Sequence, residues 1–146
     1  MIRFASLLCV GLLGATASPL WAADSDAQLK RGERVYQRFC ALCHGKNLEG
    51  QANWRRRKPD GRLPAPPHDE TGHTWHHADA VLFGIIKQGL VPPFAPPNYK
   101  SDMTGWGDTL SDDDIHAVIA YIKSRWPAET RRIQAEINAE ALKRQR

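Results

Sequence analysis

The chain has 146 residues, a length that favours one domain, and its five Trp and 42% hydrophobic residues are enough for a small core. A core of this size is often supplemented by a metal or a cofactor. The formal charge is +4 and the pI is about 9.1. The sequence has no internal repeat, no alternating strand pattern and no Gly-rich phosphate loop. These absences exclude repeat architectures, β folds and P-loop nucleotide binding, and they leave an all-α fold.

Residues 1–22 have the pattern of a cleavable secretory signal. Arg3 gives a short positive start, an apolar run follows, and small residues precede a cleavage site after Ala22 or Ala23. The apolar run is too short for a membrane-spanning helix, which needs about 20 residues. We therefore expect an exported, periplasmic protein without a membrane span; a retained N-terminal anchor is the alternative. Cys9 would be removed with the signal.

The first element after the signal is a predicted helix that has Asp26 as its cap and stops near Gly45. A long, basic and Pro-rich loop follows over residues 46–76. A loop of this length inside a compact domain is usually functional. The second predicted helix covers residues 77–87, and Gly89 ends it.

The third predicted helix has the clearest boundaries. A Pro/Gly-rich loop, residues 90–109, leads to it, Ser111 and Asp114 have the spacing of a capping box, and Pro127 stops it. From residue 128 to residue 146 the chain is mostly charged, which favours a solvated or fraying helical extension over a docking element. We expect about three core helices in residues 23–127, followed by this charged C-terminal tail.

The residues that carry chemistry are Cys40-Ala41-Leu42-Cys43-His44. Two thiols three residues apart on a helical turn project to one side, so they can add to the two vinyl groups of one haem. His44 can then be the proximal iron ligand, and this C-x-x-C-H spacing is the signature of haem attachment. A zinc site would normally need a second pair of ligands. A thioredoxin-like pair would need a βαβ context, and a disulfide across three residues would stabilise little. We therefore expect one covalent haem c.

A sixth iron ligand is available in the loop before the third helix. Met1 is the initiator, so Met103 is the remaining thioether, and it lies between Asp102 and Thr104 in a polar loop. Such a loop can present a side chain to the iron without obeying helix geometry. The alternative is a methionine that fills the core. We predict His44 and Met103 as the axial ligands, a pair that raises the reduction potential relative to two nitrogen ligands.

Three spacings connect these residues to a known family. They are Gly-x-x-x-aromatic-x-x-x-Cys in the first helix, an apolar residue three before a Tyr in the last helix, and Met-x-x-aromatic-Gly in the loop. The matching residues are Gly32, Tyr36, Cys40, Val118, Tyr121, Met103, Trp106 and Gly107. Over about residues 27–126 the sequence resembles a class I c-type cytochrome. The resemblance implies a small fold wrapped around one haem. It also implies a close crossing of the first and last core helices, with Gly32 allowing the approach and Tyr36 packing on Tyr121.

The resemblance further implies a proline carbonyl that accepts a hydrogen bond from the proximal histidine ring and orients it. Pro67 is the expected residue and Pro66 the next choice, because both precede the second helix after the long loop. The chain departs from the family pattern in the charged tail and in a longer basic loop around residues 54–62. That loop is either a docking patch for an acidic redox partner or a solvated loop.

Histidines outside the motif are concentrated in the long loop, at His68, His73, His76 and His77, with His116 on the last core helix. One interpretation is a copper or zinc site, or a replacement for Met103 on the iron. We favour hydrogen-bonding and helix-start roles, because these are the usual roles of polar loop histidines.

Together these features predict a periplasmic one-electron carrier, which is an electron-transfer protein and not an enzyme by itself. Its expected partners are redox proteins with acidic docking surfaces, not nucleic acid, and we expect a monomer. Two alternatives stay open. One is a cytochrome subunit of a larger periplasmic oxidoreductase complex, and the other is a haem enzyme or sensor with a displaceable sixth ligand. Met103 weighs against the second alternative.

Overall fold

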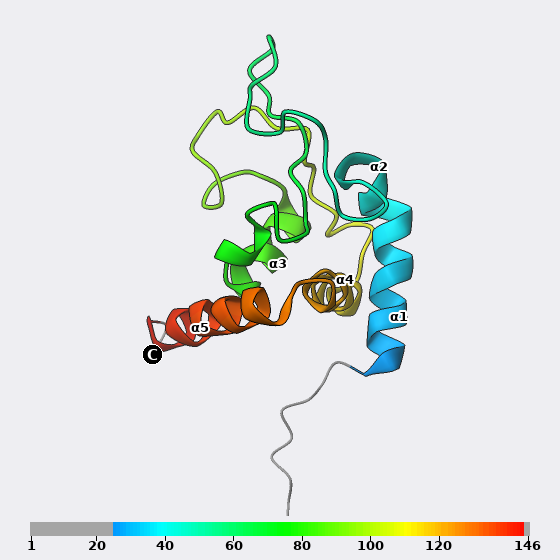
Figure 1. The fold of residues 1–146 in the computed structure, drawn as a ribbon. Helices are drawn as coiled ribbons and strands as arrows, with labels where there is room; N and C mark the ends of the chain where they lie inside the picture. The colour runs from blue at the N-terminus through cyan, green and yellow to red at the C-terminus, as the bar shows by residue number, and fades with distance from the viewer. Residues whose placement is uncertain (1–24, 145–146) are drawn as a thin grey trace, which may run out of the picture.

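The structure of the chain is a computed structural model that describes residues 25–144. The expected signal segment, residues 1–22, lies outside the described residues, as do residues 145 and 146. The described part is helical and has no strand, which confirms the all-α prediction (Figure 1). In chain order its elements are α1 (Asp26–Val35), the π-helical turn η1 (Tyr36–Cys40), α2 (Ala41–His44), the 3-10 turn η2 (Thr74–His76), α3 (Asp79–Gln88), α4 (Asp112–Ser124) and α5 (Ala128–Arg144).

Three consecutive helical elements, α1, η1 and α2, carry the C-x-x-C-H motif at their end. Ser25 caps them, because its Oγ accepts a hydrogen bond from the Gln28 amide at 3.2 Å; the cap is therefore one residue before the expected Asp26. Gly45 ends the helical run at φ +83°, a left-handed conformation that glycine adopts readily. The predicted stop near Gly45 is confirmed.

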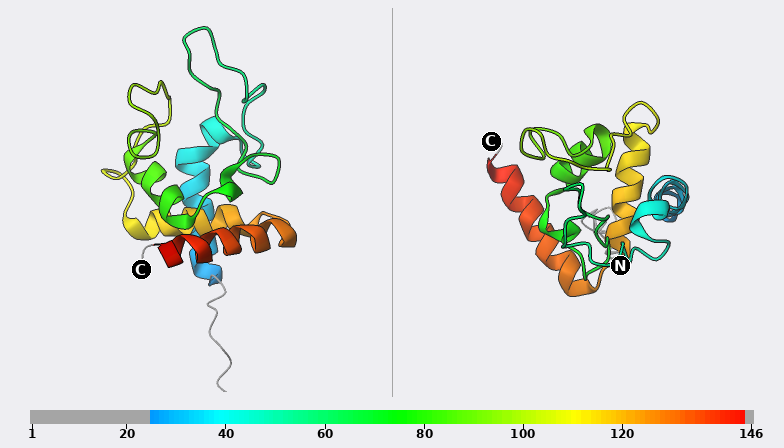
Figure 2. Two further views of the ribbon diagram at one scale, coloured as in Figure 1. Left: turned by 90° about the vertical axis from the view of Figure 1, so that its left-hand side faces the viewer. Right: turned by 90° about the horizontal axis from the view of Figure 1, so that it is seen from above.

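The close crossing of α1 and α4 is also confirmed (Figures 1 and 2). A Cβ atom on Gly32 would overlap the Ala117 carbonyl oxygen of α4, so this approach of the two backbones requires glycine. The ring centroids of Tyr36 and Tyr121 lie 5.5 Å apart, with the rings tilted against each other. The crossing fixes the direction in which α1 presents the motif.

The hydrophobic core lies between these two helices, α3 and the loops. Its buried members are Val35, Tyr36, Ala41, Leu48, Leu82, Leu110, Ile115, Val118, Ile119, Tyr121, Ile122 and Trp126. Trp126 is almost completely buried, and its indole Nε1 donates a hydrogen bond to the His68 carbonyl at 2.7 Å. This bond ties the long loop after α2 to the residues that follow α4.

The start of α3 is two residues later than predicted, at Asp79 instead of residue 77. Its first amide is capped from a distant part of the chain, because Asn138 Oδ1 of α5 accepts a hydrogen bond from the Asp79 amide at 2.6 Å. No local pattern in the sequence indicates this cap. The end of α3 at Gly89 is as predicted.

The tail forms a helix, α5, whose side chains are mostly exposed, as expected of a solvated extension, but the helix is also docked on the rest of the domain. Gln134 is completely buried, and its amide Nε2 donates to the His77 carbonyl at 3.2 Å and to Asp79 Oδ1 at 2.7 Å. Lys123 of α4 pairs with the same Asp79 carboxylate at 2.6 Å. One side of α5 is therefore packed against η2 and the start of α3, with a polar network around the buried Gln134 (Figure 2).

The two long loops, residues 45–73 and 89–111, rise on the same side of α4 and α5 (Figures 1 and 2). They bring the residues after the C-x-x-C-H motif and the residues around Met103 to one face of the molecule. Within residues 25–144, none of the helices has both the length and the apolar character that crossing a bilayer requires.

Candidate functional site

The C-x-x-C-H motif lies where the first helical run ends. Cys40 closes η1 and is half-buried, and Cys43 is exposed in α2; both are free thiols. Burial, with a smaller contribution from Cys43, raises the pKa of the Cys40 thiol to about 12, so Cys40 is protonated at neutral pH. Leu42, between the two cysteines, is 94% exposed and contributes nothing to the core.

His44, the last residue of the motif, is buried and held in one orientation. Its Nδ1 donates a hydrogen bond to the Pro66 carbonyl at 2.9 Å. Because a carbonyl can only accept, the ring proton is on Nδ1, and Nε2 carries the lone pair that a metal ion binds. Burial lowers the pKa of His44, and the Pro66 bond opposes this shift in part. The imidazole is therefore neutral near pH 7.

The accepting carbonyl is that of Pro66, which corrects the expectation of Pro67. The Pro67 carbonyl oxygen faces Gly72 instead, so closely that a Cβ there would overlap it. Gly50, at φ +68°, packs against the Pro66–Pro67 peptide, and its amide donates to the His44 carbonyl at 2.7 Å. This backbone packing determines which of the two proline carbonyls reaches His44, and it cannot be predicted from the sequence alone.

Tyr36 holds the main chain at the end of the motif. Its hydroxyl donates to the Gly45 carbonyl at 2.9 Å and lies 3.3 Å from the His44 carbonyl. Burial raises the pKa of Tyr36 well above its usual value, so the hydroxyl keeps its proton and remains a donor. The residue that packs the crossing of α1 and α4 thus also fixes the backbone of His44.

The segment that carries Met103 is tied to the end of α3. Thr104 forms an isolated bridge with Gly89, and Met103 itself is half-buried. Trp106 packs edge-on against Phe39, with 5.4 Å between the ring centroids. Since Phe39 directly precedes the C-x-x-C-H motif, this contact brings the Met103 segment and the motif into one neighbourhood.

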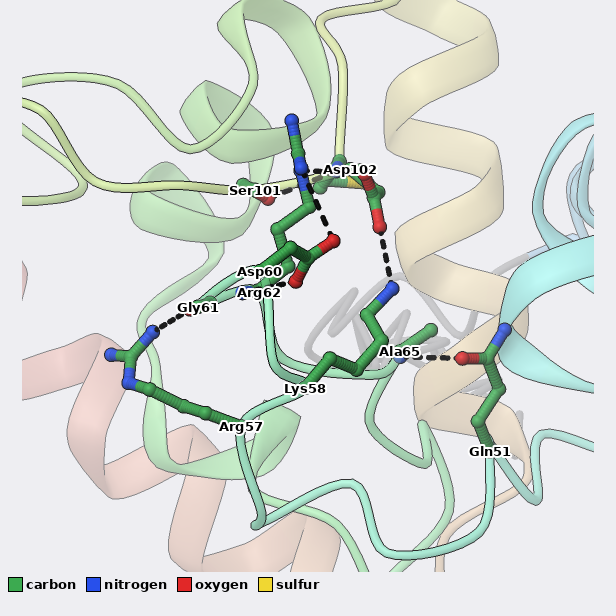
Figure 3. Close-up of polar contacts among 10 residues, drawn as sticks. Gln51, Arg57, Lys58, Asp60, Gly61, Arg62, Ala65, Ser101 and Asp102 are labelled. Carbon is green, nitrogen blue, oxygen red and sulfur yellow. Dashed lines mark hydrogen bonds and ion pairs between the residues drawn. The ribbon is translucent and has the colours of Figure 1, made fainter.

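The basic loop is paired with the Met103 segment, a feature that the sequence reasoning missed. Figure 3 shows Lys58 and Arg62 directed at the carboxylate of Asp102. Lys58 Nζ lies 2.9 Å from Oδ2, and Arg62 Nε lies 2.9 Å from Oδ1 in an ion pair that is not aligned as a hydrogen bond. Arg62 also pairs with Asp60 at 3.2 Å. The partners are about 40 residues apart in the sequence, so no local spacing could have indicated the contact.

The loop histidines do not converge on one point. The ring centroid of His68 lies 3.9 Å from that of His44, His73 stacks on Trp54 at 5.4 Å, and His116 lies on α4. In residues 25–144, no group of three or more His, Cys, Asp or Glu side chains is placed to hold a metal ion. The described residues therefore give no support to the interpretation of a second metal site.

The helical fold and the motif at the end of its first helical run define a class I c-type cytochrome domain. Residues 27–122 match the family model described as cytochrome c oxidase, cbb3-type, subunit III. This match covers well over half of the chain, which therefore belongs to that family. The family implies covalently bound haem c and haem-based electron transfer. A search of the curated proteins finds no match.

The residues present fit this cofactor. The donor set consists of two free thiols, a neutral imidazole with its lone pair on Nε2, and the half-buried thioether of Met103. Thiols three residues apart and a neighbouring histidine are the groups that haem c requires. Half-buried apolar side chains pack around the core beside them: Phe39, Trp75, Phe83, Ile86 and Trp106.

Proposed function

We propose that the chain is an exported one-electron carrier with a single haem, attached through Cys40 and Cys43 and ligated by His44 and Met103. When bound, the haem supplies a reversible one-electron couple. The observation that carries the proposal is the 2.9 Å hydrogen bond from His44 Nδ1 to the Pro66 carbonyl, which leaves a neutral imidazole with its Nε2 lone pair beside two free thiols. A disulfide would not need this orientation of His44, and a zinc site would need a larger group of ligating side chains than residues 25–144 provide.

Each residue has a defined task in this proposal. The Pro66 carbonyl orients the His44 ring and raises its basicity as a ligand. Tyr36 holds the main chain of His44, so the ring does not have to be ordered each time the charge of the site changes. His44 and Met103 would together hold the iron, which would leave no position for a substrate, and this suits a carrier.

The test begins with the pyridine haemochrome spectrum of the purified protein. It should show two thioether links and one haem per chain, and another ratio would overturn the single-haem assignment. The reduced wild-type protein should not bind carbon monoxide rapidly, whereas Met103→Ala should. Leu42→Ala is the matched control, because this side chain is 94% exposed and should leave both results unchanged. Rapid binding by the wild type would instead favour an enzyme or sensor with a displaceable ligand.

A second candidate is a cytochrome subunit of a larger oxidoreductase. The observation in its favour is the family description, which names a subunit of a cbb3-type oxidase. Purification from a native membrane and soluble extract separates the two candidates. A stoichiometric complex with other redox subunits supports the subunit role, and recovery as a free monomer supports the carrier.

Export is the remaining part of the proposal, and residues 1–22 support it through their signal-like pattern. The intact mass of the haem-loaded protein should correspond to a chain that begins at Ala23 or Asp24. A haem-loaded chain that keeps Met1 would contradict cleavage and favour a retained N-terminal anchor.

A further inference from the structure

The contact between the basic loop and the Met103 segment has the form of a clamp. We use the name Asp102 clamp for Lys58, Arg62 and Asp102. The two cations meet the two oxygens of one carboxylate, each at 2.9 Å. Asp102 directly precedes Met103 in the sequence, so whatever holds Asp102 also restrains the thioether next to it.

The cationic half of the clamp is a rigid turn. The Lys58 amide donates to the Arg62 carbonyl at 2.8 Å, and the Gly61 amide donates to the Lys58 carbonyl at 2.9 Å. Asp60 reinforces the turn, because its Oδ1 accepts from the Arg62 amide at 2.9 Å and its Oδ2 pairs with the Arg62 guanidinium. Lys58 and Arg62 therefore stand at the two paired ends of one turn and reach the same carboxylate (Figure 3).

Two further contacts extend the same junction along the Met103 segment. Lys100 Nζ donates to the Asp60 carbonyl at 3.3 Å, and the Arg57 guanidinium lies over the Tyr99 ring at 5.4 Å from its centroid. The basic loop thus runs along residues 99–102, which precede Met103. The bridge from Thr104 to Gly89 fixes the chain directly after Met103.

These contacts bear on the two interpretations of the basic loop, a docking patch for a redox partner or a solvated loop. A docking patch needs positive charges that are available to a partner. Lys58 and Arg62 are each about 40% exposed at the side chain, and both are neutralised by an acidic residue of the same chain. An internal structural role therefore accounts for them better than a docking role.

The geometry points to Lys58, Arg62 and Asp102 as positioning residues that keep the Met103 thioether in place. This inference rests on the proposed function, because it assumes that Met103 is an axial ligand. Two exposed ion pairs on one carboxylate are each weak, so breaking them should loosen the segment without unfolding the domain. The expected effect is an increase of about three- to tenfold in the affinity of an external ligand that competes with Met103.

The experiment measures the binding of imidazole to the ferric, haem-loaded protein. Asp102→Asn and Lys58→Gln should each raise the imidazole affinity about three- to tenfold, and the double variant should add little to Asp102→Asn. Lys30→Gln removes the same charge from an exposed position on α1 and should have no effect. Added salt should raise the affinity of the wild type but not that of Asp102→Asn, because salt screens exposed pairs.

The readouts separate the clamp from a general loss of stability and from an error in the ligand assignment. Thermal unfolding of Asp102→Asn should stay close to that of the wild type, and a parallel fall in stability would contradict a positioning role. The wild type should show the weak long-wavelength charge-transfer band of a ferric iron bound to methionine, and Met103→Ala should lose it. If the wild type shows the band, Met103→Ala loses it and Asp102→Asn binds imidazole like the wild type, the positioning role of the Asp102 clamp is refuted and Met103 remains the assigned ligand. If the wild type lacks the band, both the clamp and the assignment of Met103 as a ligand are refuted.

Discussion

The crossing of α1 and α4 gives the sharpest test of the fold, through the substitution Gly32→Ala. The new Cβ would overlap the Ala117 carbonyl oxygen and crowd Tyr121 Cβ. Backbone atoms and a Cβ cannot rotate away, so the two helices would have to separate. Overpacking of this kind typically costs about 1–3 kcal/mol. Because none of the neighbours of Gly32 is flexible, we expect the cost of Gly32→Ala to lie at the upper end of this range.

The helix propensity of alanine opposes this penalty. Alanine in place of glycine stabilises a helix interior by about 1 kcal/mol. With about 3 kcal/mol for the overlap, the expected net loss of unfolding free energy is about 2 kcal/mol. For a domain of this size, such a loss lowers Tm by about 8 °C.

Gly84→Ala is the matched control, because Gly84 is also a helical glycine with a crowded Cβ position. Its close neighbours are the outer ring atoms of Phe94, a half-buried loop side chain that can turn aside. We expect its unfolding free energy within about 0.5 kcal/mol of the wild type. Both haem-loaded variants are unfolded in guanidinium chloride and followed by far-ultraviolet circular dichroism. Wild-type or higher stability of Gly32→Ala, or an equal loss in both variants, would refute the steric argument.

Three further predictions concern polar contacts. Tyr36→Phe should lower the unfolding free energy by about 1–2 kcal/mol in guanidinium titration, because the Gly45 carbonyl loses the Tyr36 donor and the His44 carbonyl keeps only the Gly50 amide. Gln134→Leu should lower it by about 2 kcal/mol, since it removes the two hydrogen bonds that the buried Gln134 amide donates to His77 and Asp79. Glu136→Gln, on the exposed face of α5, should not lower it, and similar losses in both variants would argue against the role of the Gln134 hydrogen bonds. The hydrogen bond from Arg31 lowers the pKa of Asp114 to about 2, below its unfolded value of about 3.9. This contact therefore stabilises the fold fully above about pH 4, and the stabilisation is lost as the pH falls through about 2. The stability difference between the wild type and Arg31→Gln, measured by urea unfolding, should shrink over that range, and a constant difference would contradict the linkage.

The sequence predicts those parts of the fold that depend on neighbouring residues. Ser111 and Asp114 form the capping box that their spacing indicates, and α4 starts directly after it. Gly45 and Gly89 both end helices in a left-handed conformation. These signals are local, because a cap or a glycine stop acts on amides and carbonyls within one turn.

The spacings that resemble a c-type cytochrome predict some long-range contacts as well. Gly32 lies at the helix crossing, and Tyr36 packs on Tyr121, as the resemblance implied. The physical properties of the residues alone do not specify this pairing. The glycine spacing is informative only because a known family uses it at a helix crossing.

Contacts between distant segments account for what the sequence did not predict. The choice of Pro66 over Pro67 depends on how Gly50 and Gly72 pack against that peptide. The pairing of the basic loop with Asp102 joins residues 40 and 44 positions apart. A charge count treats such residues as solvated because it contains no information about their partners.

The docking of α5 is the third case of this kind, and the reason is composition. A helix with few apolar residues is usually placed in solvent, because burial of polar groups is unfavourable unless they are hydrogen-bonded. In α5 the buried side chain is a polar one, Gln134, and its hydrogen bonds to η2 and α3 make that burial acceptable.

The cap that α5 places on α3 also determines how this part of the molecule opens. Asp79 accepts from Gln134 and Lys123 and donates its amide to Asn138, so three helices share one acidic residue. If α5 detaches, the first turn of α3 loses its cap and the Asp79 carboxylate loses the Gln134 donor, so that Lys123 alone still pairs with it. The amides of α5 and of the first turn of α3 should therefore exchange with solvent deuterium at a common rate, as one cooperative unit. Such a common rate would make the C-terminal helix an integral part of the domain and not an appendage.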